Sequence, residues 1–205
     1  MNAEIIPSIL VKTREEFEAR VRLVEPHFAS VQLDITDGIF VPNKTLDSFA
    51  EVETIDTELL YGVHMMVSKP ENHVARWLTL ENVNEICFHV ESTTKHLEVI
   101  KALRETDVSV GIVLNPKTPW KDIESFVNLV DFAQFMTVEP GFNGAPFVPA
   151  VIEKIADFHF YYPDKPITVD GGITPDKIEE LEKAGVTRAI VGSAITKFFP
   201  NHLIT

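Results

Sequence analysis

The sequence is poor in cysteine and in long apolar runs. Cys87 is the only cysteine among 205 residues, so an intramolecular disulfide is excluded. A lone cysteine is typical of a reducing, cytoplasmic setting, because disulfides accumulate in oxidising compartments. Nothing approaches the ~18 uninterrupted apolar residues of a membrane span. The start, Met1-Asn2-Ala3-Glu4, lacks the basic and apolar regions of a signal peptide. We therefore expect a cytoplasmic protein without a membrane partner.

Basic residues are also scarce. The chain carries 18 lysines and arginines against 31 aspartates and glutamates, which gives a formal net charge of −13. Such a field repels nucleic acid and anionic membranes, so we exclude both as main partners. An anionic metabolite would have to be held by local donors, such as backbone N–H groups at helix N-termini, rather than by a broad basic surface.

The size and composition are those of a globular protein. Hydrophobic residues make up 45% of the chain and charged residues 24%, which is enough to bury a sizeable core. No linker, internal repeat or low-complexity segment divides the sequence. We expect one domain over residues 1–205.

Apolar segments bounded by turn residues alternate with segments of helical periodicity along the whole chain. This alternation indicates parallel strands joined by helices. Eight such units favour a closed (β/α)8 TIM barrel of eight parallel strands over an open sheet. The strands are expected at residues 4–10, from 31 onward, and at 59–67, 85–92, 109–115, 132–138, 166–170 and 188–191. The helices are expected at 13–26, around 48–55, at 72–80, around 97–103, from 118 to about 130, at 147–158 and 174–185, with a short final helix within 196–205.

Three of these helices have recognisable start signals. Thr13 followed by Glu16 forms a capping-box pattern. Thr118-Pro119 and Thr174-Pro175 are each typical of an N-cap followed by proline at the first helical position. Gly185 is placed to end the helix that begins near Thr174.

Polar residues collect at the predicted carboxyl ends of the strands, where such a barrel places its active site. They include two carboxylates and one or two imidazoles, which suit proton transfer or metal binding. Turn capping is the alternative role for Asp34 and Asp37, and Asp37, directly before a glycine, is best interpreted in that way. We interpret His89 as a supporting or core residue rather than a ligand. The set comprises Ser8, Gln32, Asp34, His64, His89, Asn115, Thr137, Asp170 and Ser193.

Six of the nine glycines fall just after the second, sixth, seventh and eighth predicted strands. Glycine lets the backbone approach a ligand closely, and the last two loops of such a barrel often form a phosphate site. The alternative is that these glycines only turn strands into helices. Their clustering favours a phosphorylated ligand held by backbone donors. The six are Gly38, Gly141, Gly144, Gly171, Gly172 and Gly192.

Three sulfur-containing side chains lie on or near these strand ends. Cys87 is expected to pack in the core beside Phe88. Met66 and Met136 are either core residues or an apolar wall beside a ligand.

The chain resembles the ribulose-phosphate 3-epimerases along nearly its whole length. The resemblance rests on eight pieces in one order, one near each predicted strand end, and is therefore highly specific. The pieces are Pro7-Ser8-Ile9-Leu10; Leu33-Asp34 through Asp37-Gly38 to Phe40-Val41-Pro42-Asn43; His64-Met65-Met66-Val67 before Pro70; Phe88-His89-Val90-Glu91; Leu114-Asn115-Pro116-Lys117-Thr118-Pro119; Met136-Thr137-Val138-Glu139-Pro140-Gly141-Phe142; Val169-Asp170-Gly171-Gly172-Ile173; and Gly192-Ser193-Ala194-Ile195.

The resemblance implies a metal-dependent isomerase that converts ribulose 5-phosphate to xylulose 5-phosphate in the pentose phosphate pathway, assembled as a homo-oligomer. Asp34 and Asp170 would be an acid/base pair on opposite faces of C3, acting through an enediolate. His64 would bind one divalent metal ion together with both aspartates and would also contact the substrate. The other implied substrate contacts are Ser8, Met66 and Met136, with Gly141, Phe142, Asn143, Gly144, Gly171, Gly172, Gly192 and Ser193 around the phosphate.

The sequence departs from this family at four positions. Two residues before Asp34, Gln32 replaces a histidine that is a fourth metal ligand, and an amide oxygen suits harder ions better than zinc or iron. Three protein ligands can still hold a catalytic zinc, so zinc, iron, manganese and cobalt all stay open. Thr36 replaces a methionine that helps cover the site, which would expose the enediolate to water. In the phosphate loop, Asn143 and Ala145 replace a glycine and a glutamine.

Two alternatives to this activity stay open. Thr36 and the altered phosphate loop could admit a longer substrate, a hexulose 6-phosphate. Gln32 and Thr36 could also mark a sugar-phosphate-binding relative with weakened or lost catalysis, although such a binder has no chemical need for a carboxylate on each face. A related family of phosphate-sugar decarboxylases uses Asp-x-Lys-x-x-Asp at the second strand. Here Thr36 and Ile39 follow Asp34 in those places, so the lysine is absent and we discount that chemistry.

Overall fold

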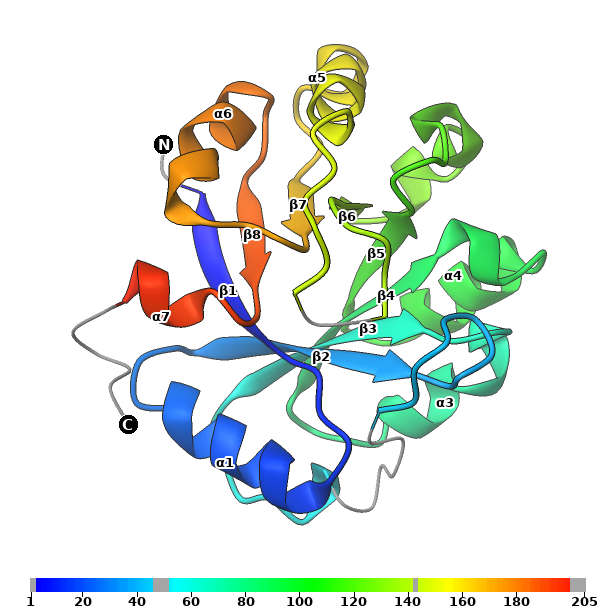
Figure 1. Cartoon of the computed structure of the whole chain (residues 1–205). Helices are drawn as coiled ribbons and strands as arrows, with labels where there is room; N and C mark the ends of the chain where they lie inside the picture. Colours follow the sequence, from blue (N-terminus) through cyan, green and yellow to red (C-terminus); the bar gives the residue numbers. More distant parts are fainter. Residues whose placement is uncertain (1–2, 46–51, 142–143, 200–205) are drawn as a thin grey trace.

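The computed structural model describes residues 3–45, 52–141 and 144–199. In this part of the chain, eight parallel strands form a closed barrel in sequence order, with the last strand pairing back onto the first. Helices and helical turns surround the barrel (Figure 1). The prediction of a (β/α)8 barrel is confirmed. Within the described residues, no helix has the length and apolar character needed to cross a membrane.

The strands lie within three residues of their predicted boundaries. The strand predicted at 85–92 ends at His89, because the next three residues form a 3-10 turn in which the Ser92 hydroxyl donates to the His89 carbonyl at 2.6 Å. The strands are β1 (Glu4–Ile9), β2 (Ser30–Thr36), β3 (Leu60–Met66), β4 (Val83–His89), β5 (Ser109–Leu114), β6 (Phe132–Met136), β7 (Ile167–Asp170) and β8 (Arg188–Val191).

The α-helices present an apolar face to the barrel. In the first of them, Phe17, Val21 and Val24 are buried, and Thr13 caps its start by accepting from the Glu16 N–H at 3.2 Å, as predicted. The α-helices are α1 (Arg14–Val24), α3 (Val74–Trp77), α4 (His96–Arg104), α5 (Val151–Tyr161), α6 (Ile178–Lys183) and α7 (Ile195–Phe198). The 3-10 turns are η1 (Pro70–Asn72), η2 (Val90–Ser92), η3 (Trp120–Ile123), η4 (Val127–Leu129) and η5 (Pro175–Lys177).

The α-helix predicted from 118 to about 130 is wrong, because this segment forms the two 3-10 turns η3 and η4. The ammonium group of Lys154 donates to three carbonyls just before η3, including that of Thr118 at 3.0 Å. Those carbonyls are therefore engaged by a side chain rather than by the first turn of an α-helix. The predicted cap is also wrong. The Thr118 hydroxyl donates to Glu91, and Pro119 occupies the N-cap position.

Other helices differ from the prediction in length. The helix predicted at 72–80 is reduced to the single turn of α3, and the one predicted at 147–158 begins only at Val151, after Pro149. The weak helix expected around 48–55 falls mostly on residues outside the described part of the chain. Gly185, with φ of +103°, follows α6 as predicted. The final helix α7 is short, also as predicted.

An ion pair fills the barrel near its amino-terminal end. Arg188 at the start of β8 reaches across to Glu85 on β4, and its two guanidinium nitrogens donate to the carboxylate at 2.6 and 3.1 Å. The same guanidinium lies 4.4 Å from the ring centre of Phe132. Paired hydrogen bonds of this kind fix both side chains in direction as well as in distance. The opposite, carboxyl-terminal end is left for the other polar residues of the interior.

Gly111 on β5 marks a position where the interior has no spare volume. A Cβ atom there would lie 2.2 Å from Phe132 and 2.7 Å from Cys87. We expect Gly111→Ala to lower the free energy of unfolding by roughly 1–3 kcal/mol, because an overpacked core must shift. Gly62→Ala on β3 is the matched control, since a Cβ there would lie no closer than 3.3 Å to its nearest neighbour, a carboxylate oxygen of Glu85. Denaturant unfolding that shows equal losses for the two variants would contradict this packing argument.

Candidate active site

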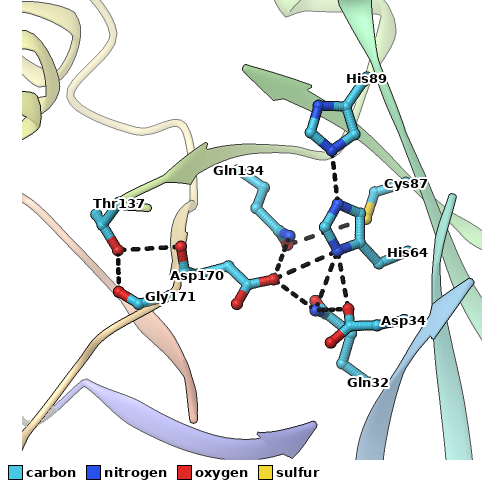
Figure 2. Close-up of polar contacts among 9 residues, drawn as sticks. All are labelled: Gln32, Asp34, His64, Cys87, His89, Gln134, Thr137, Asp170 and Gly171. Atoms are coloured by element: carbon cyan, nitrogen blue, oxygen red, sulfur yellow. Dashed lines mark hydrogen bonds and ion pairs between the residues drawn. The ribbon is translucent and has the colours of Figure 1, made fainter. Parts of the chain in front are cut away.

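Three polar side chains meet at the carboxyl-terminal end of the barrel. Asp34 lies on β2 and His64 on β3, and the strand register pairs these two residues directly. Asp170 ends β7, which is separated from β2 by β1 and β8. All three side chains are buried and point toward a common centre (Figure 2). The closure of the barrel thus brings together residues that are far apart in the sequence.

The donor atoms of this group fit a divalent metal ion. His64 Nδ1 lies 2.9 Å from Asp34 Oδ1 and 3.3 Å from Asp170 Oδ2, and one ligand atom from each residue lies within 4.8 Å of the others. Ligands bound tetrahedrally at ~2.0–2.2 Å from zinc stand roughly 3.3–3.6 Å apart, so a small movement suffices. One imidazole and two carboxylates also suit iron, manganese and cobalt. The chemistry of the three residues therefore fits a metal without selecting one.

Gln32 lies in the middle of the same group. Its Nε2 donates to Asp34 Oδ1 at 2.8 Å and to Asp170 Oδ2 at 2.7 Å, and it lies 3.3 Å from His64 Nδ1. Its Oε1 is buried and has no hydrogen-bond partner among the described residues. The side chain that replaces the family's histidine thus contacts every member of the candidate metal set.

The Asp34 carboxyl group and the His64 imidazole both have pKa values shifted by their surroundings. Burial raises the pKa of Asp34, and the charge of Asp170 raises it further, against hydrogen bonds from His64 and Gln32. Burial alone would lower the pKa of His64, but hydrogen bonds to Asp170 and Asp34 outweigh it and raise this pKa to about 9. In the metal-free protein, His64 is therefore an imidazolium at neutral pH that partly neutralises the carboxylate pair.

His89 supports His64 from behind, as predicted. The two Nε2 atoms lie 2.9 Å apart (Figure 2). Burial lowers the pKa of His89 to about 4, so its ring is neutral and can accept the Nε2–H of His64. The other nitrogen, Nδ1, faces the Glu91 carboxylate at 3.4 Å. Because Nε2 of His64 donates its proton to His89, the other ring nitrogen, Nδ1, faces Asp34 and Asp170. A metal ion bound there would need the lone pair of this Nδ1.

Asp170 is anchored by β6. The Thr137 N–H and hydroxyl both donate to the Asp170 carbonyl, at 2.7 and 3.0 Å. The side chain of Gln134, which is fully buried, donates to Asp170 Oδ2 at 3.3 Å. Gln134 was not among the residues predicted from the sequence. The signal that could have found it is a polar residue within an otherwise apolar strand, two positions before Met136 and so on the same face of the strand. Glu91 was not predicted as a site residue either, although it belongs to the Phe88-His89-Val90-Glu91 piece that resembles the family.

A cavity of about 300 Å³ opens above the carboxylates. Asp34 and Asp170 lie on its wall, whereas His64 and Gln32 lie below them and do not line it. Lys197 is the one cationic residue among the described residues that line the cavity. The other predicted residues found on its wall are Ser8, Met66, Met136, Gly141, Gly144, Gly171, Gly172, Gly192 and Ser193.

The backbone at the start of the β7–α6 connection leaves no room for side chains. Gly171 and Gly172 have φ of +111° and +62°, and a Cβ on Gly171 would lie 2.3 Å from Val138. A Cβ on Gly172 would lie 3.1 Å from the Phe147 nitrogen. Only glycine fits both the conformation and the space, so the backbone itself forms this part of the cavity wall.

Some candidates fall outside the cavity. Asp37 caps its turn as predicted, because its carboxylate accepts from the N–H groups of Ile39 at 2.8 Å and Phe40 at 2.9 Å. Thr36 was expected to open the site to water. The residue is fully buried and does not line the cavity, so its effect on water access stays a prediction. Phe142 and Asn143 lie outside the described residues.

Comparison with known proteins identifies the family. A family model described as "Ribulose-phosphate 3 epimerase family" matches residues 4–196. The chain belongs to the ribulose-phosphate 3-epimerase family. It is 32% identical over 200 residues to the ribulose-phosphate 3-epimerase of Schizosaccharomyces pombe, covering 95% of this chain and 87% of the relative. The corresponding enzyme of Bacillus subtilis is 30% identical over 200 residues, covering 94% and 91%. The chain is therefore an isomerase-class enzyme, an epimerase.

Solved structures at low identity support the fold alone. A mutant tryptophan synthase α-subunit from Pyrococcus furiosus aligns with a TM-score of 0.68 at 14% identity, covering 97% of this epimerase and 91% of that chain. Orotidine 5'-monophosphate decarboxylase from Sulfolobus solfataricus gives 0.62 at 10% identity, covering 93% and 88%. Both agree with the barrel described above.

The metal-free epimerase should lose stability as the pH rises from 6.5 to 9. Folding raises the pKa of His64 from 6.5 to about 9, so this stabilisation is complete below pH 6.5 and is lost as the pH passes through 9. The shift corresponds to roughly 3 kcal/mol. Chemical unfolding in the presence of a chelator, compared between the native protein and His64→Asn, isolates the contribution. Identical pH dependence in the two proteins would contradict it.

Proposed function

We propose that this epimerase inverts C3 of ribulose 5-phosphate to give xylulose 5-phosphate, with Asp34 and Asp170 as its acid/base pair. One observation carries the proposal. Two carboxylates reach the base of a single cavity from different walls of the barrel, one on β2 and one on β7. A substrate carbon lying between them would present one face to each carboxylate. The names of the curated relatives supply the substrate class.

Two carboxylates allow inversion without turning the intermediate over. One aspartate, as the carboxylate, takes the proton from C3 and leaves an enediolate. The other, as the carboxylic acid, gives its proton to the opposite face of C3 and becomes a carboxylate. This division requires one of the pair to be protonated at neutral pH. In the metal-free protein, burial raises the pKa of Asp34 and the charge of Asp170 raises it further.

A divalent metal ion is part of the proposal, because a proton next to a ketone is too weakly acidic for a carboxylate alone. Asp34, His64 and Asp170 would hold the ion, and zinc, iron, manganese and cobalt are the candidates. The bound ion would act as a Lewis acid that stabilises the negative charge developing on the enediolate oxygens. His64 must lose its proton to serve as a ligand, which its contact with neutral His89 permits without breaking their hydrogen bond.

The glycine-lined part of the cavity would hold the phosphate. Backbone N–H groups of Gly171, Gly172 and Gly192 are candidate donors, because all three residues line the cavity and have no side chain of their own. The hydroxyl of Ser193 lies on the same wall. Lys197 adds one positive charge to a protein of net charge −13. Phosphate recognition would thus depend mainly on neutral donors.

Ser8, Met66 and Met136 would contact the rest of the sugar, since all three line the cavity beside the carboxylates. The two methionines would give the enediolate an apolar wall. Thr36 lies off the cavity wall, so it supplies no extra room for a hexulose 6-phosphate. Retention of both carboxylates at the cavity base favours a catalyst over a sugar-phosphate-binding relative.

The activity can be tested by hydrogen exchange. We expect the protein, supplied with zinc, iron, manganese or cobalt in turn, to exchange the C3 proton of ribulose 5-phosphate with deuterium from D2O. Proton NMR of the recovered sugar phosphates measures the exchange. A chelated sample is the control and should exchange far more slowly. If no metal of the panel supports exchange, the proposal for this substrate is wrong.

Asp170→Asn should abolish turnover while leaving the barrel folded, because the amide is nearly the same shape but cannot accept or deliver the proton. We expect a loss of at least about a hundredfold in kcat, the scale of one general acid or base. Circular dichroism and thermal unfolding check the fold. Asp37→Asn is the matched control, since Asp37 caps a turn outside the cavity, and it should keep its activity. Full turnover by Asp170→Asn would remove Asp170 from the mechanism.

A further inference from the structure

The chain contains two glutamines in 205 residues, and both lie at the base of the candidate active site. Gln32 projects from β2 and Gln134 from β6, and each donates from its amide nitrogen to Asp170 (Figure 2). Both are buried, with exposures of 3% and 0%. A residue type that the rest of the sequence avoids is thus used twice beneath one pair of carboxylates.

The two amides differ in what their oxygen atoms contact. Gln134 Oε1 accepts from the Cys87 thiol at 3.9 Å, so both ends of that amide are engaged. Gln32 Oε1 is buried with no partner among the described residues, whereas its nitrogen contacts all three members of the candidate metal set. Leaving a buried acceptor unpaired costs free energy. The amide nitrogen of Gln32 therefore has hydrogen-bond partners, while its amide oxygen has none among the described residues.

The charges around Gln32 dictate this orientation in the absence of a cation. An NH2 group between Asp34 and Asp170 makes two charge-assisted hydrogen bonds, of 2.8 and 2.7 Å. The reverse orientation would place the carbonyl oxygen against two carboxylate oxygens at the same distances. A cation bound by Asp34, His64 and Asp170 would reverse the preference, because it would repel the NH2 group and attract the carbonyl oxygen.

We propose that the Gln32 amide turns by half a rotation when a divalent cation binds, so that its oxygen replaces its nitrogen at the centre of the site. This inference rests on the metal site of the proposed function. The last torsion of a glutamine side chain is broad and roughly two-fold, so the turn needs no movement of β2. In the metal-free protein the NH2 group occupies the place of the cation and keeps the two carboxylates in position.

The turn makes Gln32 a determinant of metal affinity and selectivity. Binding has to break two hydrogen bonds to charged groups, which weakens the affinity relative to a site without an internal donor. Once turned, the amide offers a neutral oxygen, a ligand type that favours harder ions over zinc. Zinc remains the most convenient probe, because it is diamagnetic.

Glutamine-selective labelling tests the proposal on the intact protein. With carbon-13 at Cδ and nitrogen-15 at Nε2, the spectrum should contain two side-chain amides, and Gln134→Met or Gln32→Met assigns them by removing one. Zinc is added to chelator-stripped protein. We expect the Gln32 Cδ and Nε2 signals to shift on zinc binding, with the Gln134 signals nearly unchanged as the internal control. Nitrogen-15 labelling of histidine reports zinc binding independently through the His64 ring.

The outcomes separate this inference from the function on which it rests. A shift of the His64 ring signals together with the Gln32 amide supports the turn. Zinc that shifts His64 but leaves the Gln32 amide as in the stripped protein overturns the turn and keeps the metal site. Zinc that shifts neither overturns the metal site and the turn together. Shifts of equal size in both glutamines also contradict a turn confined to Gln32.

Discussion

Two carboxylates at the base of one cavity repel each other, and the site depends on how that repulsion is compensated. Asp34 and Asp170 share the same two partners, the imidazole of His64 and the amide nitrogen of Gln32. The His64 imidazolium contributes a positive charge beside the carboxylates, and the Gln32 amide contributes two hydrogen bonds that orient them. Burial raises the pKa of Asp34, and the hydrogen bonds from His64 and Gln32 oppose that shift. A metal ion would replace this compensation by a stronger one at the same place.

The barrel makes this arrangement possible because it fixes side chains from distant strands on one centre. His64 is held by its register with β2 and by His89 behind it. Asp170 is held through its own carbonyl, which accepts two hydrogen bonds from Thr137. The side chains that would do the chemistry are thus positioned by backbone pairing and by groups that the substrate would not touch. Such support keeps a site rigid while its loops vary.

Much of this could be predicted from the sequence, for identifiable reasons. The strands were found because apolar runs end at turn residues, and Asp34, His64 and Asp170 were found because they stand where those runs end. The failures come from tertiary contacts that a local pattern does not contain. Residues 118–130 have helical spacing, but Lys154 binds the preceding carbonyls and Thr118 is drawn to Glu91. Thr36 was expected to affect the cavity because it replaces a family methionine, yet its side chain is fully buried and does not line the cavity.

Gln32 shows what the sequence leaves open. Its departure from the family was evident, but a residue name does not say which end of an amide faces the site. The structure shows that the two glutamines differ at their amide oxygens. Gln134 Oε1 accepts a hydrogen bond from Cys87, whereas Gln32 Oε1 has no partner among the described residues. In the absence of a metal ion, Gln32 therefore contributes to the site through its amide nitrogen, which donates to both carboxylates.

The central claim is that two aspartates work on opposite faces of C3, and the origin of the product's hydrogen tests it most directly. Ribulose 5-phosphate would be converted in D2O and analysed at low conversion by mass spectrometry and proton NMR. The account predicts that the first xylulose 5-phosphate formed carries one deuterium at C3, because the second aspartate delivers a proton that came from solvent. Product that retains the substrate's own C3 hydrogen would mean that a single base carries it across, and would contradict the account.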